Sequence, residues 1–225
     1  MIMTRTRLPG VQRRGQIVAA ARRVFSQHGY DGAKTLQIAR EAKVSEALVF
    51  RHFPSKLALY RAVLRQVFLE QDERWREQGV HGEGARGLAS AIHTFISACA
   101  TDADDPARHD THRMTLASLA GDGSYASLIY RRSQRRHGAA MDAAYASARA
   151  EGGLEGEPLD VPAAAMFVEH VGTMMAAIGG LPLAARPYGI AGDDLVRQAT
   201  WFCLRGIGMP DRIIADYFAS LASDT

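Results

Sequence analysis

TLQIAREAKVSEALVFRHF, the stretch from Thr35 to Phe53, decides how the N-terminal part of the chain folds. It contains two short apolar groups at helical spacing, separated by Lys43-Val44-Ser45. Ser45 is expected to cap the second helix and Thr35 the first, because a hydroxyl oxygen accepts a hydrogen bond from an amide one turn on. Isolated helices below roughly 12–15 residues are marginal, so this pair needs a third helix to pack on. A basic pair of this kind is typical of a helix-turn-helix, whose second helix enters the DNA major groove.

Length and composition favour a helical protein with two modest domains or one large one. The chain has 225 residues, of which 47% are hydrophobic, and it lacks runs of alternating β-branched residues bounded by turns. The expected fold class is therefore all-α. No apolar run reaches the roughly 18 residues of a membrane span, and no apolar segment follows the basic N-terminus as in a secretory signal. Cys99 and Cys203 stand far apart in apolar helical contexts, which indicates reduced core thiols in a cytosolic protein.

Charge is distributed unevenly along the chain. Residues 1–65 contain 13 Lys and Arg residues against three acids, a net charge of +10. The remaining residues contain 14 Arg and 21 acids, a net charge of −7, so the whole chain carries only +3. A basic segment in a near-neutral protein indicates a polyanion as the partner of that segment, although a solvated basic surface would show the same charge.

Helical periodicity and turn residues place eight longer helices. Gly29 is expected to end the first, because glycine tolerates the left-handed conformation that follows many helix C-termini. Ser55 is expected to cap the second. The eight are predicted at about residues 13–28, 55–78, 84–101, 106–120, 125–151, 162–178, 193–206 and 211–222. A basic arm to about residue 10 precedes them, and it either approaches DNA phosphates through residues such as Arg5 and Arg7 or is a solvated tail.

The N-terminal third of the chain resembles the TetR family of bacterial transcriptional regulators. The resemblance covers roughly residues 13–64 and rests on Phe25-x-x-x-Gly29-Tyr30, Ile38-Ala39, Val44-Ser45, Val49-Phe50-Arg51-His52-Phe53 and Pro54-Ser55-Lys56 with Leu57 and Leu59 beyond. It implies a three-helix helix-turn-helix DNA-binding domain at residues 11–71 and a larger helical domain for ligand binding and dimerisation at residues 72–225. It also implies a homodimer in the bacterial cytosol that binds a near-palindromic operator in double-stranded DNA.

Three positions depart from the family pattern. Lys43 stands where the family usually has glycine, so it either adopts a left-handed conformation or reshapes the turn. Lys34 stands where a threonine or serine is usual, which moves the first cap toward Thr35. Phe50 replaces a tyrosine whose hydroxyl reaches a phosphate, and phenylalanine cannot make that hydrogen bond.

The resemblance also implies individual DNA contacts. Ala47 and Leu48 are expected to meet thymine methyl groups, and Glu46 either accepts from a cytosine amine or complements the helix dipole. The full set of expected DNA-contacting residues is Lys34, Thr35, Lys43, Ser45, Glu46, Ala47, Leu48, Phe50, Arg51, His52 and Lys56, with Arg51 at a guanine or a phosphate and with His52 and Lys56 at phosphates. Phe53 and Leu57 are expected in the core.

A dimer face is expected on two helices of the second domain. Residues 162–180 are almost continuously apolar, whereas residues 125–151 carry an arginine-rich stretch. We expect residues 162–180 and 193–206 to pair with their copies in a four-helix arrangement, as the resemblance implies. The alternative is that residues 162–180 form a monomeric core helix.

An effector is expected because family members commonly respond to a small molecule held in the second domain. The molecule is expected to be largely apolar and to release DNA by favouring another conformer. Candidate ligand-binding residues are Phe95, Met114, Tyr125, Met166, His170, Met174 and Phe202, each of which is otherwise ordinary core. Glu169, beside His170, either orients a ligand or forms a salt bridge across the dimer.

Two other functions remain open from the sequence. His109-x-x-His112, near Asp105 and Asp110, has the spacing for two metal ligands on one helix face, as a helical metal-dependent enzyme would need. No third ligand is defined, and there is no Gly-rich phosphate loop or nucleophile elbow, so we expect no catalytic residue, no metal and no cofactor. The second alternative is a dimeric DNA-binding protein without an effector, with steep salt dependence and little sequence discrimination.

Overall fold

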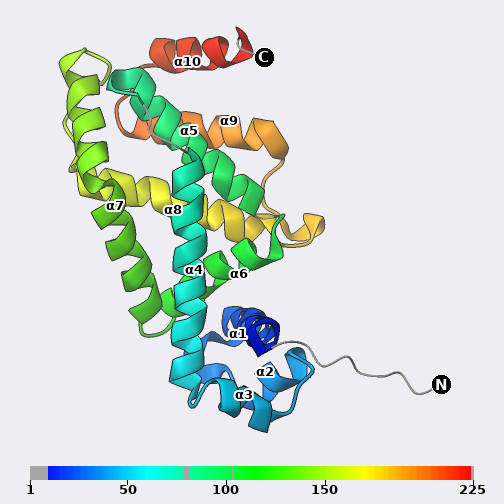
Figure 1. Cartoon of the computed structure of the whole chain (residues 1–225). Coiled ribbons are helices and arrows are strands. Elements are labelled where there is room, and N and C mark those ends of the chain that lie inside the picture. The colour runs from blue at the N-terminus through cyan, green and yellow to red at the C-terminus, as the bar shows by residue number, and fades with distance from the viewer. Residues whose placement is uncertain (1–9, 79–81, 103, 224–225) are drawn as a thin grey trace. The chain divides into compact units, whose positions relative to one another are not determined.

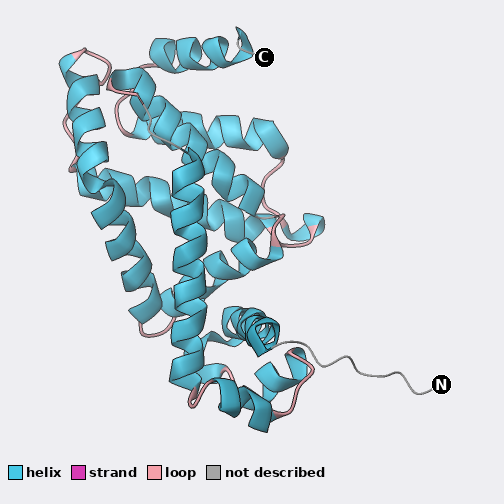
Figure 2. Cartoon of the chain, in the orientation of Figure 1, coloured by secondary structure: helices cyan, strands magenta, loops and turns pink. Residues whose placement is uncertain are grey.

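The structure is a computed structural model that describes residues 10–78, 82–102 and 104–223, and the regular structure of these residues is entirely helical (Figures 1 and 2). Its helices are α1 (Gly10–Gly32), α2 (Thr35–Glu41), α3 (Glu46–His52), α4 (Lys56–Gln78), α5 (Gly84–Asp102), α6 (Pro106–Leu119), α7 (Ser124–Ala150), α8 (Val161–Gly179), the 3-10 turn η1 (Leu183–Ala185), α9 (Gly192–Gly206) and α10 (Asp211–Ser223). The expected all-α fold class is confirmed. The predicted helices from residue 55 onward begin and end within one residue of the observed ones. Arg5 and Arg7 of the basic arm lie outside the described residues.

The chain divides into two compact units. The N-terminal unit holds the described residues up to Glu77 together with Arg113–Ala126, and the C-terminal unit holds those of Gln78–His112 and Ser127–Thr225. The second part of α6 and the start of α7 therefore belong to the N-terminal unit, although the chain reaches them only after α5. The assignment of DNA binding to residues 11–71 and of ligand binding and dimerisation to residues 72–225 stays a prediction.

α1 supplies the central stripe of the N-terminal unit. The side chains of this stripe are at most 6% exposed, and they are Ile17, Ala20, Ala21, Val24 and Phe25. The helix breaks at Gly29, where φ is 65° and ψ is −178°. A β-carbon disfavours positive φ, so the predicted end of the first regular helical run at this glycine is confirmed. α2 packs on α1, and α3 packs on α2.

Buried side chains of α3 and α4 complete this core. Val49 is 1% exposed, Phe53 is 3% exposed and Leu59 is fully buried. The prediction that Phe53 belongs to the core is confirmed. The same prediction for Leu57 is wrong, because its side chain is 43% exposed. Two residues span more than half a helical turn, so Leu57 lies on the opposite side of α4 from the buried Leu59.

α5 is the central helix of the C-terminal unit. It packs against α8 and α9, and α10 packs against α5 and α9 (Figure 1). Leu88, Ile96 and Leu204 are fully buried at this junction. Cys99 and Cys203 are buried, as expected of core thiols, and burial raises the pKa of Cys203 to about 11.

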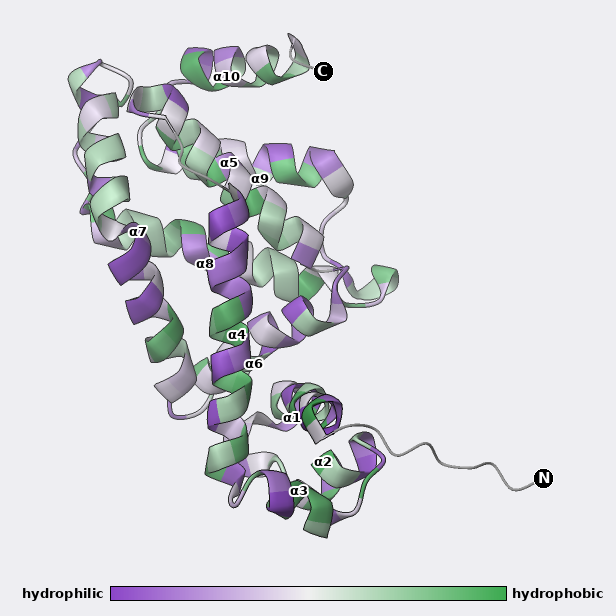
Figure 3. Ribbon diagram, in the orientation of Figure 1, coloured by the Kyte–Doolittle hydropathy of each residue, from purple (hydrophilic) through white to green (hydrophobic). Residues whose placement is uncertain are grey.

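α8 is long and apolar, and only part of it is buried. By length and composition alone it is the one helix of the described residues that could cross a membrane, although the sequence predicted no apolar run long enough. Figure 3 shows most of it in white and green, in contrast to the purple stretch of α7. Glu169 and His170 divide its apolar residues, and its inner side, including Val168 and Met175, belongs to the core of the C-terminal unit.

Candidate nucleic-acid interface

Backbone hydrogen bonds close the turn between α2 and α3. Val44 N donates to Ala39 O at 2.9 Å, and Lys43 N donates to Arg40 O at 3.0 Å. These two bonds form a Schellman motif, in which the residue after the C-cap usually has left-handed φ and is usually glycine. Lys43 has a φ of 55° and is the one non-glycine residue with positive φ in the described ranges. Lys43 therefore keeps the turn geometry that glycine usually provides, at the expense of steric strain at its β-carbon.

Side-chain contacts fix the start of α3 and join it to α2. Ser45 Oγ accepts from Leu48 N at 3.2 Å, which confirms Ser45 as the N-cap. The prediction that Thr35 caps α2 is wrong, because the N-cap is Lys34 and the Thr35 hydroxyl instead donates to Glu46 Oε1 at 2.5 Å. Glu46 lies in the first turn of α3, so its carboxylate also complements the helix dipole.

α3 is buried on one side and exposed on the other. Val49 and the adjoining Phe53 hold its inner side in the core. Its outer side carries the exposed Ala47, Phe50 and Arg51, while Glu46, Leu48 and His52 are half-buried. Phe50 is 43% exposed, which is unusual for so large an apolar side chain. The helix thus presents small, apolar and cationic groups on a rigidly held outer face, and these are the groups that read base edges and phosphates in a major groove.

Lys56 is engaged within the N-terminal unit. Its Nζ donates to the backbone carbonyl oxygens of Tyr30 at 2.8 Å, Asp31 at 3.3 Å and Ala33 at 3.1 Å. An ammonium group has three N–H donors, so these carbonyls occupy all of them. Nζ also lies 4.5 Å from the centroid of the Tyr30 ring. Lys56 therefore secures the connection between α1 and α2, and the phosphate contact predicted for it requires these bonds to be exchanged.

Some of the positively charged side chains in residues 1–65 form ion pairs within the fold. Arg22 is 4% exposed and its guanidinium lies 2.7 Å from a Glu70 carboxylate oxygen, which joins α1 to α4. The exposed Arg23 pairs with Glu41 at 2.7 Å and joins α1 to α2. Several cations of the basic segment therefore hold the three-helix unit together, so its net charge overstates what is available to a polyanion.

The seven predicted ligand-binding residues are divided between the two units. Met114 and Tyr125 belong to the N-terminal unit and are 3% and 0% exposed. The other five belong to the C-terminal unit, where Phe95 and Met166 are half-buried and His170, Met174 and Phe202 are exposed. A pocket lined by Met114 also includes Tyr60 and Asp122. The sequence did not single these two out, because only folding brings α4 and the turn before α7 together.

The histidine pair of α6 has separate partners. His112 Nε2 lies 2.9 Å from Oδ2 of the fully buried Asp102, and His109 Nε2 lies 3.1 Å from Ala177 O. In the ranges that the structure describes, no three His, Cys, Asp or Glu side chains come together as a metal site. Burial raises the pKa of the Glu169 carboxyl, and the nearby His112 opposes that shift. The neighbouring His170 differs from Glu169 in its surroundings, because His170 is exposed and its ring lies 5.4 Å from that of Tyr130.

The fold and the α2–α3 turn define the class of this protein, an α-helical chain with an N-terminal helix-turn-helix. Residues 17–63 match the sequence model of the family described as bacterial regulatory proteins, tetR family. Residues 17–63 are thus a DNA-binding domain of the TetR type, as the resemblance implied.

Curated relatives match the same part of the chain. The transcriptional activator FasR of Mycolicibacterium smegmatis is 48% identical over 60 residues, 27% of each chain. The transcriptional regulator RutR of Escherichia coli K12 is 51% identical over 51 residues, 23% of this chain and 24% of RutR. The chain thus spans about a quarter of the length of the curated relatives it matches.

Solved structures share the fold over most of the chain. The ketosteroid transcriptional regulator KstR2 of Mycobacterium tuberculosis superposes with a TM-score of 0.62 at 19% identity, covering 88% of this chain and 96% of KstR2. A TetR-like transcriptional regulator from Rhodococcus sp. RHA1 superposes with a TM-score of 0.59 at 20% identity, covering 89% of this chain and all of that one. At such identities the likeness shows a common fold alone.

Proposed function

We propose that the chain is a homodimeric transcriptional regulator of the bacterial cytosol that binds a near-palindromic operator and represses transcription until a small, largely apolar molecule releases it. The observation that carries DNA binding is the outer face of α3. Val49 and Phe53 fix this helix from behind, Ser45 caps it, and Arg51 lies exposed on its outer side. A helix held in this way enters a major groove without losing much conformational entropy on binding.

Exposed apolar side chains support a dimer through α8 and α9. Phe167 is 65% exposed and Met174 45% exposed on α8, and Phe202 is 69% exposed on α9. α8 and α9 contact one another, so these side chains belong to neighbouring helices of the same unit. Large apolar groups gathered on a surface usually mark a contact with another protein. A second copy also supplies the second recognition helix that a near-palindromic site requires.

Effector binding is supported by the family resemblance and by polar groups buried in the C-terminal unit. These groups are the Asp102–His112 pair and the Glu169 carboxyl, whose pKa is raised by burial. Ligand sites combine mostly apolar walls with a few well-placed polar groups. Release of DNA requires the effector to bind the two conformers with unequal affinity.

DNA binding is tested by fluorescence anisotropy with the DNA upstream of the protein's own gene and with random DNA of equal length, at one salt concentration. We expect preferential binding to the upstream DNA. Arg51→Ala should weaken that binding by about 5- to 150-fold, the range of about 1–3 kcal/mol for a base or phosphate contact. Arg131→Ala on α7 removes the same charge from another exposed position and should leave affinity unchanged. Equal affinity for both DNAs, or equal loss in both variants, would refute sequence reading by α3.

Dimerisation is tested by light scattering after size exclusion. Phe202→Asp and Phe167→Asp should convert the dimer to a monomer and abolish operator binding. Leu69→Asp places the same charge at a 56% exposed apolar position of α4 and should leave the dimer intact. A dimer that survives both changes on α8 and α9 would contradict the assigned face.

The effector mechanism is tested by screening apolar compounds for thermal stabilisation of the full chain and then for loss of operator binding. At least one stabilising compound should lower operator affinity. If compounds that bind the C-terminal unit leave operator affinity unchanged, the release mechanism fails and the protein is an effector-independent DNA-binding protein.

A further inference from the structure

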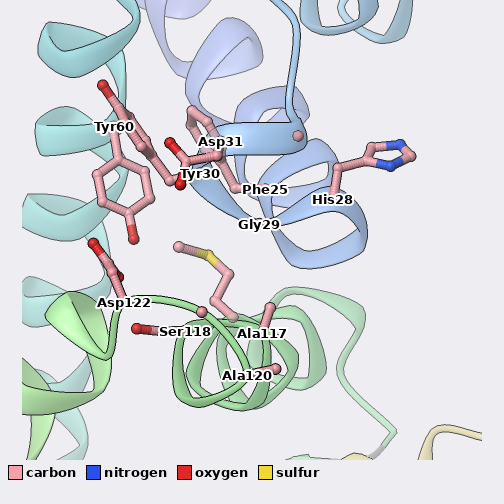
Figure 4. Close-up of a pocket in the computed structure, with 13 residues that line it drawn as sticks. Phe25, His28, Gly29, Tyr30, Asp31, Tyr60, Ala117, Ser118, Ala120 and Asp122 are labelled. Atoms are coloured by element: carbon pink, nitrogen blue, oxygen red, sulfur yellow. The ribbon is translucent and has the colours of Figure 1, made fainter.

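A pocket opens in the N-terminal unit beside the connection between α1 and α2 (Figure 4). One side is formed by Phe25, Tyr30 and Tyr60, and the facing side includes Met114 and Asp122. The space inside it, with its open mouth included, is about 570 Å³. The described lining residues all belong to this one unit, and none of them is among the predicted DNA-contacting residues.

The first side of the pocket is an aromatic cluster. The Tyr60 ring lies 4.9 Å from that of Phe25 in an edge-on arrangement and 4.8 Å from that of Tyr30. Aromatic faces attract cations because the ring quadrupole places negative charge above the ring. The Lys56 ammonium lies 4.5 Å from the Tyr30 centroid, so one ring of this cluster already holds a cation of the protein itself. Lys56 does not line the pocket, whereas Tyr60 does.

The opposite side supplies negative charge. Figure 4 shows the Tyr60 side chain reaching from α4 toward Asp122, in the turn before α7. Asp122 Oδ1 accepts from Ser124 N at 3.0 Å, and hydrogen bonds from Ser124 lower the pKa of this carboxyl, so it is ionised at neutral pH. Burial raises the pKa of Tyr60 to about 12, and the neighbouring Asp122 carboxylate adds to that shift. Tyr60 therefore stays a neutral phenol, and its ring keeps its affinity for cations.

The charged side chains of the described lining favour a cation over an anion. Asp31 contributes a second carboxylate, and the described lining residues include His28 but no lysine or arginine. An anionic ligand would therefore meet two carboxylates. Phe25 and Met114 offer apolar and polarisable surface to the uncharged part of a ligand.

We propose that this pocket binds a small organic cation, with the positive centre between the Tyr60 ring and the Asp122 carboxylate. The apolar part of the cation contacts Phe25 and Met114. A bound cation touches two segments: residues 28–32, which lead into α2, and residues 117–122, which form the end of α6 and the turn after it. It therefore stabilises the conformers in which these two segments lie together. Any resulting change in operator affinity rests on the proposed function, whereas binding of the cation does not.

The site is tested by calorimetric titration of the full chain with choline chloride, without DNA and at constant ionic strength maintained with sodium chloride. The matched ligand is 3,3-dimethylbutan-1-ol, which has the shape of choline and no charge. We expect saturable binding of choline and at least about tenfold weaker binding of the alcohol, since only the cation gains from the ring and the carboxylate. Equal binding of the two compounds, or no saturable binding of choline, would overturn the proposal.

Two pairs of variants separate recognition from folding. Asp122→Asn keeps an oxygen that can accept from Ser124 N and should weaken choline binding at least about tenfold, whereas Asp142→Asn makes the same charge change on α7 outside the pocket and should not. Tyr60→Phe keeps an aromatic ring and should bind choline within about threefold of the original, whereas Tyr60→Leu keeps bulk without a ring and should lose binding.

The outcomes are distinguishable from a failure of DNA binding. If Tyr60→Leu loses helicity by circular dichroism, the Asp122→Asn and Asp142→Asn pair decides the matter. Equal affinity in that pair refutes the site. Choline binding that persists in a protein without operator affinity would instead refute the proposed function and leave the cation site standing.

Discussion

The left-handed backbone at Lys43 makes a quantitative test of the helix-turn-helix possible. Lys43 has a φ of 55°, whereas its neighbour Ala42 has a φ of −77° and lies in the right-handed helical region. An Ala→Gly change should therefore have opposite effects at these adjacent positions. The comparison uses Lys43→Ala with Lys43→Gly at the first position, and the original chain with Ala42→Gly at the second. Both members of the first pair lack the lysine side chain, so its charge and its contacts cancel.

The expected magnitudes follow from two opposing terms. A β-carbon in the left-handed region costs roughly 1–2 kcal/mol, and removal of that carbon recovers this energy. Glycine loses more backbone entropy on folding than alanine, which costs about 0.5–1 kcal/mol at either position. Lys43→Gly should therefore be about 0.5–1 kcal/mol more stable than Lys43→Ala. Ala42→Gly should be about 0.5–1 kcal/mol less stable than the original chain, so the two changes should differ by about 1–2 kcal/mol.

The assay is urea denaturation followed by tryptophan fluorescence. The chain has two tryptophans, and Trp75 lies on α4 in the N-terminal unit whereas Trp201 lies on α9 in the C-terminal unit. All variants are made with Trp201→Phe, so that the remaining signal reports unfolding of the unit that contains the turn. If both Ala→Gly changes lower the free energy of unfolding equally, Lys43 does not occupy the left-handed region in solution, and the assignment of the turn as a Schellman motif is refuted.

Three further predictions concern single contacts. Ser45→Ala should lower the free energy of unfolding, measured by Trp75 fluorescence, by about 1 kcal/mol, and Ser45→Asp should restore it because a carboxylate also caps a helix. An unchanged free energy of unfolding in Ser45→Ala would contradict the role of Ser45 as a cap. Glu70→Gln should lower the free energy of unfolding by about 1–3 kcal/mol, less than for a fully buried ion pair, because Arg22 is 4% exposed but Glu70 is 37% exposed; full stability in the variant would show that this ion pair does not stabilise the N-terminal unit. Burial lowers the pKa of His93, whose Nδ1 lies 2.9 Å from Tyr217 Oη, and the Asp193 carboxylate opposes that shift only in part. The unfolded state then binds the proton more tightly than the folded state, so the free energy of unfolding should fall as the pH drops from the ordinary histidine pKa of about 6.5 toward the lowered pKa of His93. His93→Gln should flatten this decline in urea melts at a series of pH values, followed by the fluorescence of Trp201. An equal dependence on pH in both proteins would contradict the lowered pKa.

The sequence alone determined the helices and the caps that depend on neighbouring residues. The helix boundaries from residue 55 onward were predicted within one residue, because apolar periodicity and Gly, Pro and Asp punctuation act within one or two turns. Ser45 and Ser55 cap their helices as predicted, since each hydroxyl accepts from an amide three residues later in the chain. The recognition of the helix-turn-helix also came from local pattern, confirmed by the family match at residues 17–63.

Only the tertiary structure decided which partner each polar side chain found. Thr35 bonds to Glu46 on the next helix, and Lys56 bonds to carbonyls more than 20 residues earlier in the chain. The Leu57 side chain is exposed, although its apolar character led us to predict that it is buried in the core. The pocket between Tyr60 and Asp122 joins residues 62 positions apart, so no local pattern announces it. Periodicity fixes which residues form a helix because backbone hydrogen bonds span four residues, whereas burial and polar pairing depend on which helices meet, and that is set by packing across the whole unit.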